Sequence, residues 1–381
     1  MRRLTYFLLL LAGFFSTVEA QKSDSLDIMI GQMIMTGIRD YTDPGIKSKL
    51  HAQLMDGKIG GVILFEKNIL PVNSQEELAM MNLEVQRQAS IPVLIAIDEE
   101  GGRVNRLKPK YGFHKPPSAQ RLGEIDNLDS TRFYSRKTAQ NLHNLGINLN
   151  FAPVVDVNIN PQNPVIGRIQ RSFSPQYDKV AAHARAYIEG HDELRIATAL
   201  KHFPGHGSSK NDTHLGIADV SNTWVMEEIY PYKSLIDQKK VRGVMTSHVV
   251  NRSLDPEKLP GTLSNKIIEG LLRTHLGYDG VVFTDDMQMK AIADHYGLEK
   301  AILMSVNAGV DMLVFANNVP DYDLVTVDQV FDIIKKGIAD GEISEERIRA
   351  SYQRVMRLKE EIGLLDKSYV RLLRKRLKAL Y

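Results

Sequence analysis

Apolar residues along the chain follow two alternating patterns. Eight short runs are almost continuously apolar and rich in Val and Ile, which is typical of parallel strands buried on both faces. These runs are residues 32–38, 59–65, 92–98, 147–157, 196–201, 241–247, 280–285 and 310–316. Longer stretches between them have helical spacing, at 73–90, 130–145, 178–193, 222–238, 264–276, 290–309 and 326–340. The first of these helices is predicted to begin with a capping box formed by Ser74 and Glu77.

The regular order of strand followed by helix predicts the fold class. Strict alternation indicates a parallel sheet with right-handed crossovers. Eight such units in about 340 residues match one (β/α)8 TIM-type barrel, and no linker rich in Pro, Gly or Ser divides the chain. We therefore expect an α/β protein in which residues 21–381 form a single barrel domain. A doubly wound open sheet is the alternative.

The first twenty residues have the pattern of an export signal. Arg2 and Arg3 precede an apolar run over 6–15, and positions 18 and 20 carry the small residues that a signal peptidase recognises. The run is too short to span a bilayer, which needs about 20 apolar residues. We expect residues 1–20 to be a signal peptide and the mature protein to be secreted across the inner membrane, to the periplasm or the exterior. A buried amino-terminal helix is the alternative.

Composition and charge exclude several classes of protein. With 43% hydrophobic residues, 25% charged residues and no Cys, the chain is neither disordered nor built on disulfides. A formal net charge of +2 gives no basic excess for nucleic-acid binding. Residues 367–381 nevertheless hold six basic side chains and no acidic one. We expect a basic amphipathic helix there, either solvated or in weak contact with an anionic membrane or wall polymer.

Ionisable residues gather where the predicted strands end. In a barrel of this kind, functional groups lie at the carboxyl ends of the strands. Charged residues that directly follow apolar runs are hard to explain as one solvated face. They are Asp98 to Glu100 after the third strand, Asp156 after the fourth, Lys201-His202 after the fifth, Ser247-His248 after the sixth and Asp285-Asp286 after the seventh.

Two of these positions could supply a nucleophile and a proton donor. Successive strand residues point to opposite faces, so only one aspartate of the Asp285-Asp286 pair is expected to face the barrel mouth. We assign Asp285 to the mouth, as a nucleophile or base, and Asp286 to a cap in the following turn. A loop rich in Gly and Ser, residues 205–209, leads to Asp212 and His214. A carboxylate beside an imidazole fixes its tautomer, and such a histidine can protonate a leaving group and then activate water.

The stretch 98–106 could bind hydroxyl groups. Gly101-Gly102 allows a sharp turn that returns Arg103 or Arg106 to the mouth. A guanidinium and the carboxylate of Asp98 could together bind vicinal hydroxyls, although Arg103 could instead form a buried ion pair that holds the loop.

Histidine spacing raises the possibility of a metal site. His202 and His206 have the spacing of a helical zinc pair, but Pro204-Gly205 breaks any helix between them, so no metal is expected. Arg171, taken alone, is interpreted as a surface arginine.

Together these segments resemble glycoside hydrolase family 3. The resemblance covers nearly the whole chain in order and rests on residues 97–106, 171–173, 201–207 with 212–214, and 284–287. The loop that carries Asp-x-His is similar to that of the single-domain β-N-acetylhexosaminidase branch. The resemblance implies a retaining mechanism without a cofactor, acting on terminal β-linked N-acetylglucosamine of a carbohydrate such as a wall fragment.

The resemblance also implies roles for individual residues. Asp285 would form a covalent glycosyl-enzyme, and His214 would be the acid and base, with Asp212 as its orienting partner. The sugar-binding positions would be Asp98, Arg106, Arg171, Lys201 and His202. The usual second carboxylate of glycosidases is then not needed.

The chain departs from the family pattern in three respects. Glu99 stands where this branch usually has Gln, which would add a charge near the mouth. Residues 208–211 replace acidic or threonine residues, so loop and aglycone contacts would differ. Export differs from the cytoplasmic enzymes of the branch and would place wall turnover outside the inner membrane.

Other functions fit parts of the pattern. A β-glycoside phosphorylase or β-glucosidase of the same family would share the site. A divalent-metal lyase or aldolase would use Asp98, Glu100 and Asp285 with a histidine as ligands. A non-catalytic binding protein for wall sugars would bind the same ligands without turning them over.

Overall fold

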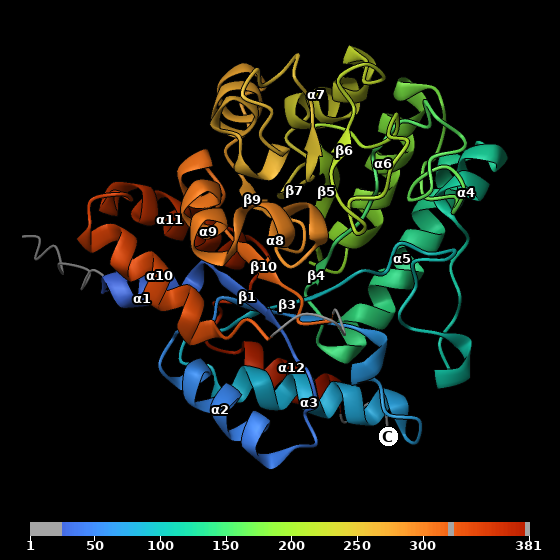
Figure 1. The fold of residues 1–381 in the computed structure, drawn as a ribbon. Helices are drawn as coiled ribbons and strands as arrows, with labels where there is room; N and C mark the ends of the chain where they lie inside the picture. Colours follow the sequence, from blue (N-terminus) through green and yellow to red (C-terminus); the bar gives the residue numbers. More distant parts are fainter. Residues whose placement is uncertain (1–24, 319–323, 378–381) are drawn as a thin grey trace, which may run out of the picture.

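The chain is described by a computed structural model over residues 25–318 and 324–377 (Figure 1). The predicted signal peptide over 1–20 lies outside the described residues. Within the described ranges, no helix combines the length and the apolar character that crossing a membrane requires.

Eight parallel strands form the centre of the fold. They are β1 (Ile34–Gly37), β2 (Gly61–Leu64), β3 (Leu94–Ile97), β4 (Leu149–Asn150), β5 (Ala197–Phe203), β7 (Gly243–Thr246), β9 (Val281–Phe283) and β10 (Leu313–Phe315). Neighbours pair in the order β10-β1-β2-β3-β4-β5-β7-β9. A parallel bridge between Phe283 and Met312 joins the two ends of this order and closes the sheet. The predicted single-domain (β/α)8 TIM-type barrel is therefore confirmed, and the open sheet is wrong.

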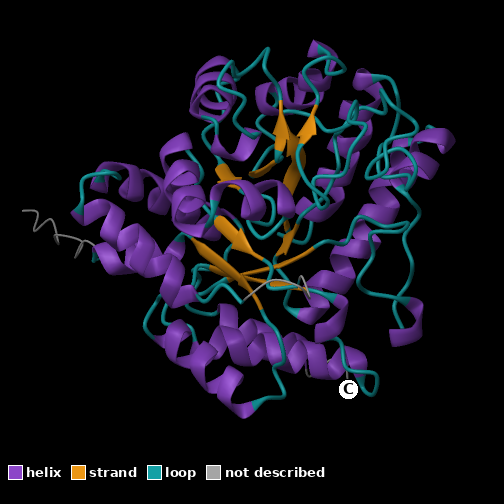
Figure 2. Cartoon of the chain, in the orientation of Figure 1, coloured by secondary structure: helices purple, strands orange, loops and turns teal. Residues whose placement is uncertain are grey.

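Helices enclose the strands (Figure 2). They are α1 (Leu26–Gln32), α2 (Pro44–Met55), α3 (Ser74–Gln88), α4 (Ala119–Ile125), α5 (Leu128–Leu145), α6 (Tyr177–Asp192), α7 (Tyr230–Asp237), a π-type helix (Lys266–His275), α8 (Lys290–Tyr296), α9 (Leu298–Ala308), α10 (Val327–Ala339), α11 (Glu345–Glu361) and α12 (Tyr369–Leu377). Short 3-10 turns cover Glu66–Asn68, Pro109–Tyr111, Met226–Ile229 and Gly261–Leu263. A separate parallel pair, β6 (Ala218–Asp219) and β8 (Val249–Val250), lies in the loops after β5 and β7.

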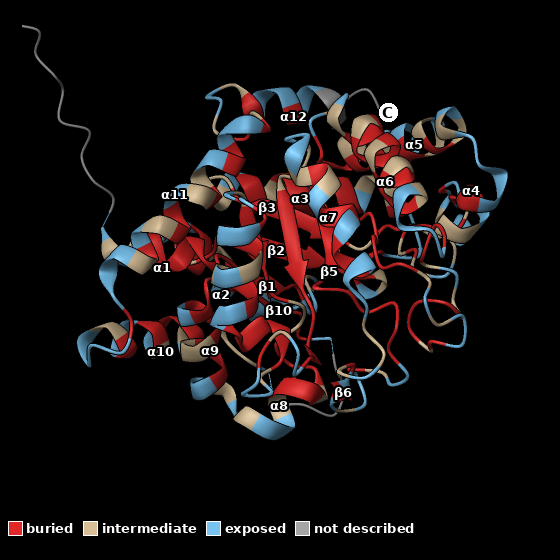
Figure 3. Ribbon diagram, turned by 90° about the horizontal axis from the view of Figure 1, so that it is seen from above, coloured by how far each residue is buried: buried red, intermediate tan, exposed pale blue. Residues whose placement is uncertain are grey.

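The core follows from the apolar runs. Strand residues are buried on both faces, while the helices expose their outer sides (Figure 3). Phe151, just after β4, and Phe283, in β9, are fully buried and meet edge to face with ring centroids 5.3 Å apart. Such close packing gives the strand ends a rigid base.

Several predicted helix boundaries are wrong for identifiable reasons. The predicted helix over 290–309 is two helices, because Gly297 (φ +71°) interrupts it. The predicted helix over 222–238 becomes α-helical only at Tyr230, where Pro231 occupies the first turn and needs no hydrogen-bond acceptor. The predicted capping box is absent: the hydroxyl of Ser74 donates to the carbonyl of Leu70 at 2.6 Å instead.

Helix α12 lies in the basic terminal segment. Leu373 is fully buried and packs on Gly146, at the end of α5. Arg371, Arg374 and Lys375 are exposed on the helix.

Candidate active site

One cavity opens at the carboxyl ends of the strands. It has a volume of about 510 Å³, within the range of small-ligand sites. Apolar walls come from Phe65, Phe151, Val165, Met245 and Met289. All eight site residues named from the sequence line this cavity: Asp98, Arg106, Arg171, Lys201, His202, Asp212, His214 and Asp285.

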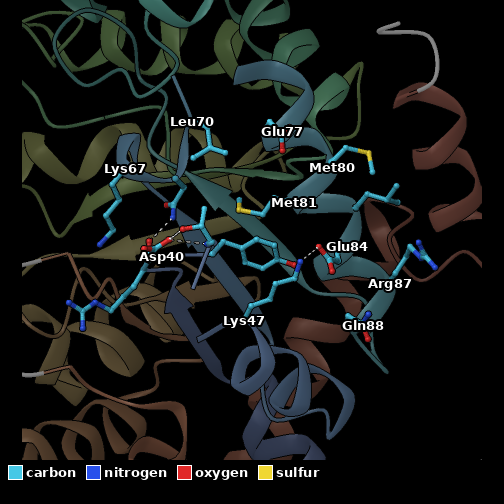
Figure 4. A pocket seen from close by; sticks show the side chains of 15 residues that line it. Asp40, Lys47, Lys67, Leu70, Glu77, Met80, Met81, Glu84, Arg87 and Gln88 are labelled. Carbon is cyan, nitrogen blue, oxygen red and sulfur yellow. Dashed lines mark hydrogen bonds and ion pairs between the residues drawn. The ribbon is translucent and has the colours of Figure 1, made fainter. Parts of the chain in front are cut away.

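A larger cavity, of about 810 Å³, lies elsewhere (Figure 4). Its wall is formed by the loop after β1 together with α2 and α3. Lys47 pairs with Glu84 at 2.8 Å across this wall, and none of the eight site residues reaches it. Of these two cavities, the smaller one is lined by ionisable residues from the ends of several strands. It is therefore the candidate active site.

Lys201 lies between two carboxylates. Asp98 and Glu100 follow the end of β3, and both carboxylates contact the same ammonium group. The Nζ atom of Lys201 is 2.8 Å from Oδ1 of Asp98 and 2.7 Å from Oε1 of Glu100. Burial would raise the pKa of both acids, but the cationic neighbours outweigh it: the pKa of Asp98 is lowered, and Arg171 and Lys201 bring that of Glu100 to about 2. Both carboxylates are thus ionised at neutral pH.

Arg171 forms a bidentate ion pair. Its Nε and Nη2 atoms donate to the two carboxylate oxygens of Glu100 at 2.9 and 2.8 Å, and Nη1 donates to the carbonyl of Val165. The side chain is only 12% exposed, so its interpretation as a surface arginine is wrong. Planar bidentate pairing of this kind fixes the guanidinium in one orientation.

Asp156 determines the tautomer of His202. This carboxylate is fully buried and lies 2.7 Å from Nδ1 of His202, which therefore carries the proton. The free lone pair on Nε2 accepts a hydrogen bond from Nη2 of Arg171 at 3.1 Å. Asp156 also accepts from the main-chain N–H of His206 at 2.8 Å. Both ring nitrogens of His202 are thus engaged, so His202 and His206 do not form a zinc pair.

The donor set does not suit the metal-dependent alternative either. In residues 25–318 and 324–377, no three His, Asp or Glu side chains are grouped so that they could hold a metal ion. The ammonium of Lys201 instead fills the space between Asp98 and Glu100, where such an ion would lie.

One carboxylate oxygen of Asp285 has no hydrogen-bond partner among the described residues. Within the described part of the chain, the recorded hydrogen bond to this carboxylate comes from the N–H of Asp286, 2.8 Å from Oδ1. Burial would raise the pKa of Asp285, but the positive charge of protonated His214 and the hydrogen bond from the N–H of Asp286 lower it. The group is therefore an ionised carboxylate that faces the cavity.

Asp286 also lines the cavity, so the expectation that only one of the two aspartates faces the mouth is wrong. The strand has already ended at Phe283, and strict alternation no longer applies. Oδ1 of Asp286 accepts from the N–H groups of Gln288 and Ala316 at 3.1 and 3.0 Å. It therefore holds a turn to β10 and does not cap α8, whose N-cap is Met289.

His214 is presented at the tip of the loop after β5. Its Nδ1 atom lies 2.8 Å from Oδ1 of Asp212, and its side chain is 64% exposed. The bond to Asp212 raises the pKa of His214, and Asp285 raises it further. Among the described residues no hydrogen bond to its Nε2 atom is made, so this atom can exchange a proton in the cavity that His214 lines.

Buried groups beneath the loop hold it in place. The N–H groups of Gly207 and Ser208 donate to Oε2 of Glu228 at 2.9 and 3.3 Å. Closer to His214, the carbonyl of Thr213 accepts from the N–H of Ala291 in α8 at 3.3 Å. The loop is thus tied at its root and near its tip.

Comparison with known proteins identifies the family. Residues 25–358 match the glycosyl hydrolase family 3 N terminal domain. The chain belongs to glycosyl hydrolase family 3. It is 32% identical to beta-hexosaminidase LpqI of Mycobacterium tuberculosis over 87% of this chain and 81% of that protein. It is 36% identical to a beta-hexosaminidase of Shewanella frigidimarina over 70% of this chain and 77% of that protein.

Solved structures agree with this assignment. A family 3 beta-N-acetylglucosaminidase from a Paenibacillus species superposes with a TM-score of 0.80 and 31% identity, over 93% of this chain and 68% of that one. A beta-N-acetylhexosaminidase from Beutenbergia cavernae gives a TM-score of 0.77 and 27% identity, over 89% and 99%. The chain is a glycoside hydrolase, and the resemblance seen in the sequence is confirmed.

Glu99 does not contribute a carboxylate to the cavity. Its carboxylate turns away from the cavity and accepts from Asn105 and from the N–H groups of Arg106 and Leu107. The prediction that Glu99 adds a charge at the mouth is therefore wrong. Its carboxylate instead holds the turn that carries Arg106. Arg103 is exposed to solvent and does not line the site.

Three contributing residues were not assigned roles from the sequence of this family 3 chain. Glu100 was named only as a ligand in the metal-dependent alternative, and its position directly after an apolar run was the signal that could have placed it in the glycosidase site. Asp156 was noted as a strand-end acid, but its bond to His202 depends on the pairing of different strands. Glu228 precedes α7 with no motif around it, and only the folded chain places it beneath the loop.

Proposed function

We propose that this chain is a retaining β-N-acetylglucosaminidase that releases terminal β-linked N-acetylglucosamine. Relatives that cover most of the chain carry the names beta-hexosaminidase and beta-N-acetylglucosaminidase. The observation that carries the proposal is that one cavity is lined by both Asp285, whose second carboxylate oxygen has no hydrogen-bond partner among the described residues, and His214, whose ring is held by Asp212 through Nδ1.

In the first step, an oxygen of Asp285 attacks the anomeric carbon. A glycosyl–carboxylate bond forms as the bond to the leaving oxygen breaks, through an oxocarbenium-like transition state. Protonated His214 donates its Nε2 proton to the leaving oxygen, and Asp212 stabilises the imidazolium through Nδ1–H. The products of this step are the free aglycone, the glycosyl-enzyme and neutral His214.

In the second step, water releases the sugar. Neutral His214 takes a proton from water at Nε2, the water oxygen attacks the anomeric carbon, and the bond to Asp285 breaks. The carboxylate and the protonated imidazole are restored. Two displacements at one carbon retain the β configuration.

The polar wall would bind the sugar hydroxyls. Asp98 and Arg106 are only loosely paired at 3.4 Å, so each can exchange this contact for a hydroxyl group. The buried Nε atom of Arg106 has no partner among the described residues. Lys201, Arg171 and His202 are locked together by Glu100 and Asp156, which preorganises the donors that remain.

We also propose export and a wall-derived substrate. These rest on the signal-like residues 1–20 and on the family resemblance, with peptidoglycan fragments as the N-acetylglucosamine source outside the inner membrane. The exposed basic residues of α12 could add weak contact with an anionic membrane or wall polymer. Cell fractionation with amino-terminal sequencing of the mature protein tests export: cleavage after Ala20 supports it, and an intact cytoplasmic chain contradicts it.

Hydrolysis of three substrates tests the activity. We expect turnover of 4-nitrophenyl β-N-acetylglucosaminide and of purified muropeptides, and much slower turnover of the β-glucoside. The first product detected by NMR should be the β-anomer. Asp285→Asn should lose about three orders of magnitude in kcat, near 4 kcal/mol, while Asp340→Asn, at an exposed position, should not change it.

The same assays separate the alternatives. Preference for the glucoside would indicate a β-glucosidase, and sugar phosphate formed in phosphate buffer would indicate a phosphorylase. Binding without turnover would indicate a wall-sugar binding protein, and loss of activity with a chelator would indicate a metal enzyme. Full activity of Asp285→Asn would overturn the assigned nucleophile.

A further inference from the structure

His248 is a buried titratable residue with no part in the proposed chemistry. It lies two residues after the end of β7, is fully buried and does not line the cavity. Its Nε2 atom lies 3.0 Å from the carbonyl oxygen of Asp286, and its Nδ1 atom lies 2.8 Å from the hydroxyl of Thr262. The ring thus spans the space between the end of β7 and the segment that carries Asp285.

The hydrogen bonds fix the protonation of this ring. A main-chain carbonyl can only accept, so Nε2 must carry a proton. In the neutral ring Nδ1 is then an acceptor, and the hydroxyl of Thr262, which also lies 3.2 Å from the carbonyl of Ser247, donates to the nearer Nδ1 atom. Thr262 in turn lies 2.7 Å from the hydroxyl of Thr246, which completes a chain of donors that ends at Asp286. Burial lowers the pKa of His248, which agrees with a neutral ring.

Asp286 transmits this contact to Asp285. The carbonyl of Asp286 accepts from His248 and, at 3.0 Å, from the N–H of Met289, and its carboxylate is held by the N–H of Ala316 after β10. Its own N–H is the group that donates to Oδ1 of Asp285. The carboxylate of Asp285 is therefore aimed by a residue that is anchored from two different strands.

We propose that His248 is a positioning residue for Asp285: its Nε2–H holds the Asp286 carbonyl and thereby sets the attack geometry of the neighbouring carboxylate. This inference rests on the proposed function, in which Asp285 is the nucleophile. Misplacement of a reacting group by about 1 Å can cost on the order of a hundredfold in rate. Loss of the hydrogen bond from His248 to the carbonyl of Asp286 therefore lowers kcat and leaves ground-state binding of the sugar intact.

Two substitutions separate positioning from packing. The amide nitrogen of Gln reaches roughly the place of Nε2, whereas that of Asn reaches only the place of Nδ1. We expect His248→Asn to lower kcat about 10- to 100-fold on a substrate with a good leaving group, with KM and inhibition by free N-acetylglucosamine unchanged. His248→Gln should retain kcat within a few-fold, and His275→Asn, at an exposed position, should match the wild type.

The outcomes distinguish this inference from the proposed function. Wild-type kcat in His248→Asn, or equal losses in the Asn and Gln variants, would overturn the positioning role while Asp285→Asn remains inactive. Activity in Asp285→Asn would instead overturn the proposed nucleophile. Nitrogen NMR of labelled histidine adds a direct check: a ring protonated at Nε2 supports the inference, and a neutral ring protonated only at Nδ1 contradicts it.

Discussion

Oδ1 of Asp212 accepts two hydrogen bonds from His214, one from the ring Nδ1 and one from the main-chain N–H, both at 2.8 Å. The pair is therefore a small rigid unit, although the histidine itself is largely exposed. The contact places a ring proton on Nδ1 and leaves Nε2 for the proposed proton transfer in the cavity that His214 lines. The two hydrogen bonds therefore fix the orientation of the His214 ring, although the side chain is exposed on a loop.

Removal of His214 should affect substrates according to their leaving groups. His214→Ala removes the proposed proton donor, so a poorly activated aglycone should lose about 10²- to 10⁴-fold in kcat/KM. A nitrophenol leaving group needs little protonation and should lose much less in the bond-breaking step. Rates for a series of aryl glycosides measure this difference. An equal loss across the series would refute the acid role.

The pH profile should depend on Asp212. Because Asp212 raises the pKa of His214, the wild-type general acid stays protonated above its ordinary value of 6.5. Asp212→Asn keeps an acceptor but removes the charge, so the basic limb of kcat/KM against pH should move to lower pH. The acidic limb, to which Asp285 contributes, should stay in place because the pKa of that group is already lowered. A basic limb that does not move would show that another group controls it.

Glu228 should control the order of the loop. Glu228→Ala leaves the N–H groups of Gly207 and Ser208 buried without an acceptor, at a cost of about 1–3 kcal/mol each. Glu228→Gln keeps a carbonyl acceptor and should lose less stability. Thermal unfolding and hydrogen exchange over 205–214 measure both variants. Unchanged exchange in Glu228→Ala would show that the loop is held elsewhere.

Lys359 should limit stability at neutral pH. Its side chain is fully buried, its Nζ atom donates to Oε1 of Gln32 at 2.5 Å, and burial lowers its pKa to about 7. The unfolded chain keeps the ordinary value of about 10.4, so the folded state is disfavoured by roughly 4–5 kcal/mol at and below pH 7. Stability from this group therefore rises as pH increases from 7 to 10.

Substitution by Met tests this point. Lys359→Met should raise the free energy of unfolding at pH 7 by about 2 kcal/mol, since the unpaired oxygen of Gln32 offsets part of the gain. The difference from wild type should shrink between pH 7 and 9. Lys300→Met, at an exposed position, should show neither effect. Denaturant unfolding at several pH values measures these differences, and a pH-independent gain would contradict the assigned cause.

The strands could be predicted because their pattern is unambiguous. Each predicted apolar run overlaps one barrel strand, and Asp98 and Asp285 could be placed at the mouth from their position after such a run. Helices were harder. In α11, buried residues recur at helical spacing, as in Ile348, Tyr352 and Val355, so the signal was present and was missed.

The remaining site geometry depends on contacts distant in sequence. Arg171 looks like any loop arginine until Glu100, 71 residues away, forms a bidentate pair with it. The carboxylate of Glu99 is oriented by hydrogen bonds from main-chain N–H groups of the following turn. The periodicity of the sequence does not predict these bonds. Local pattern therefore identified the residues that end strands, whereas their partners required the closed barrel.

The place where the barrel closes has a consequence for when activity can arise. The bridge between Phe283 and Met312 and main-chain bonds such as that from the N–H of Thr284 to the carbonyl of Met312 join the last two strands, and the bond from Ala316 to Asp286 crosses the same seam. A chain that stopped ahead of residue 313 would contain every charged side chain of the site and still lack this tie beside the proposed nucleophile. We therefore expect incompletely synthesised or truncated chains to be inactive, and hydrolysis to require the closed barrel.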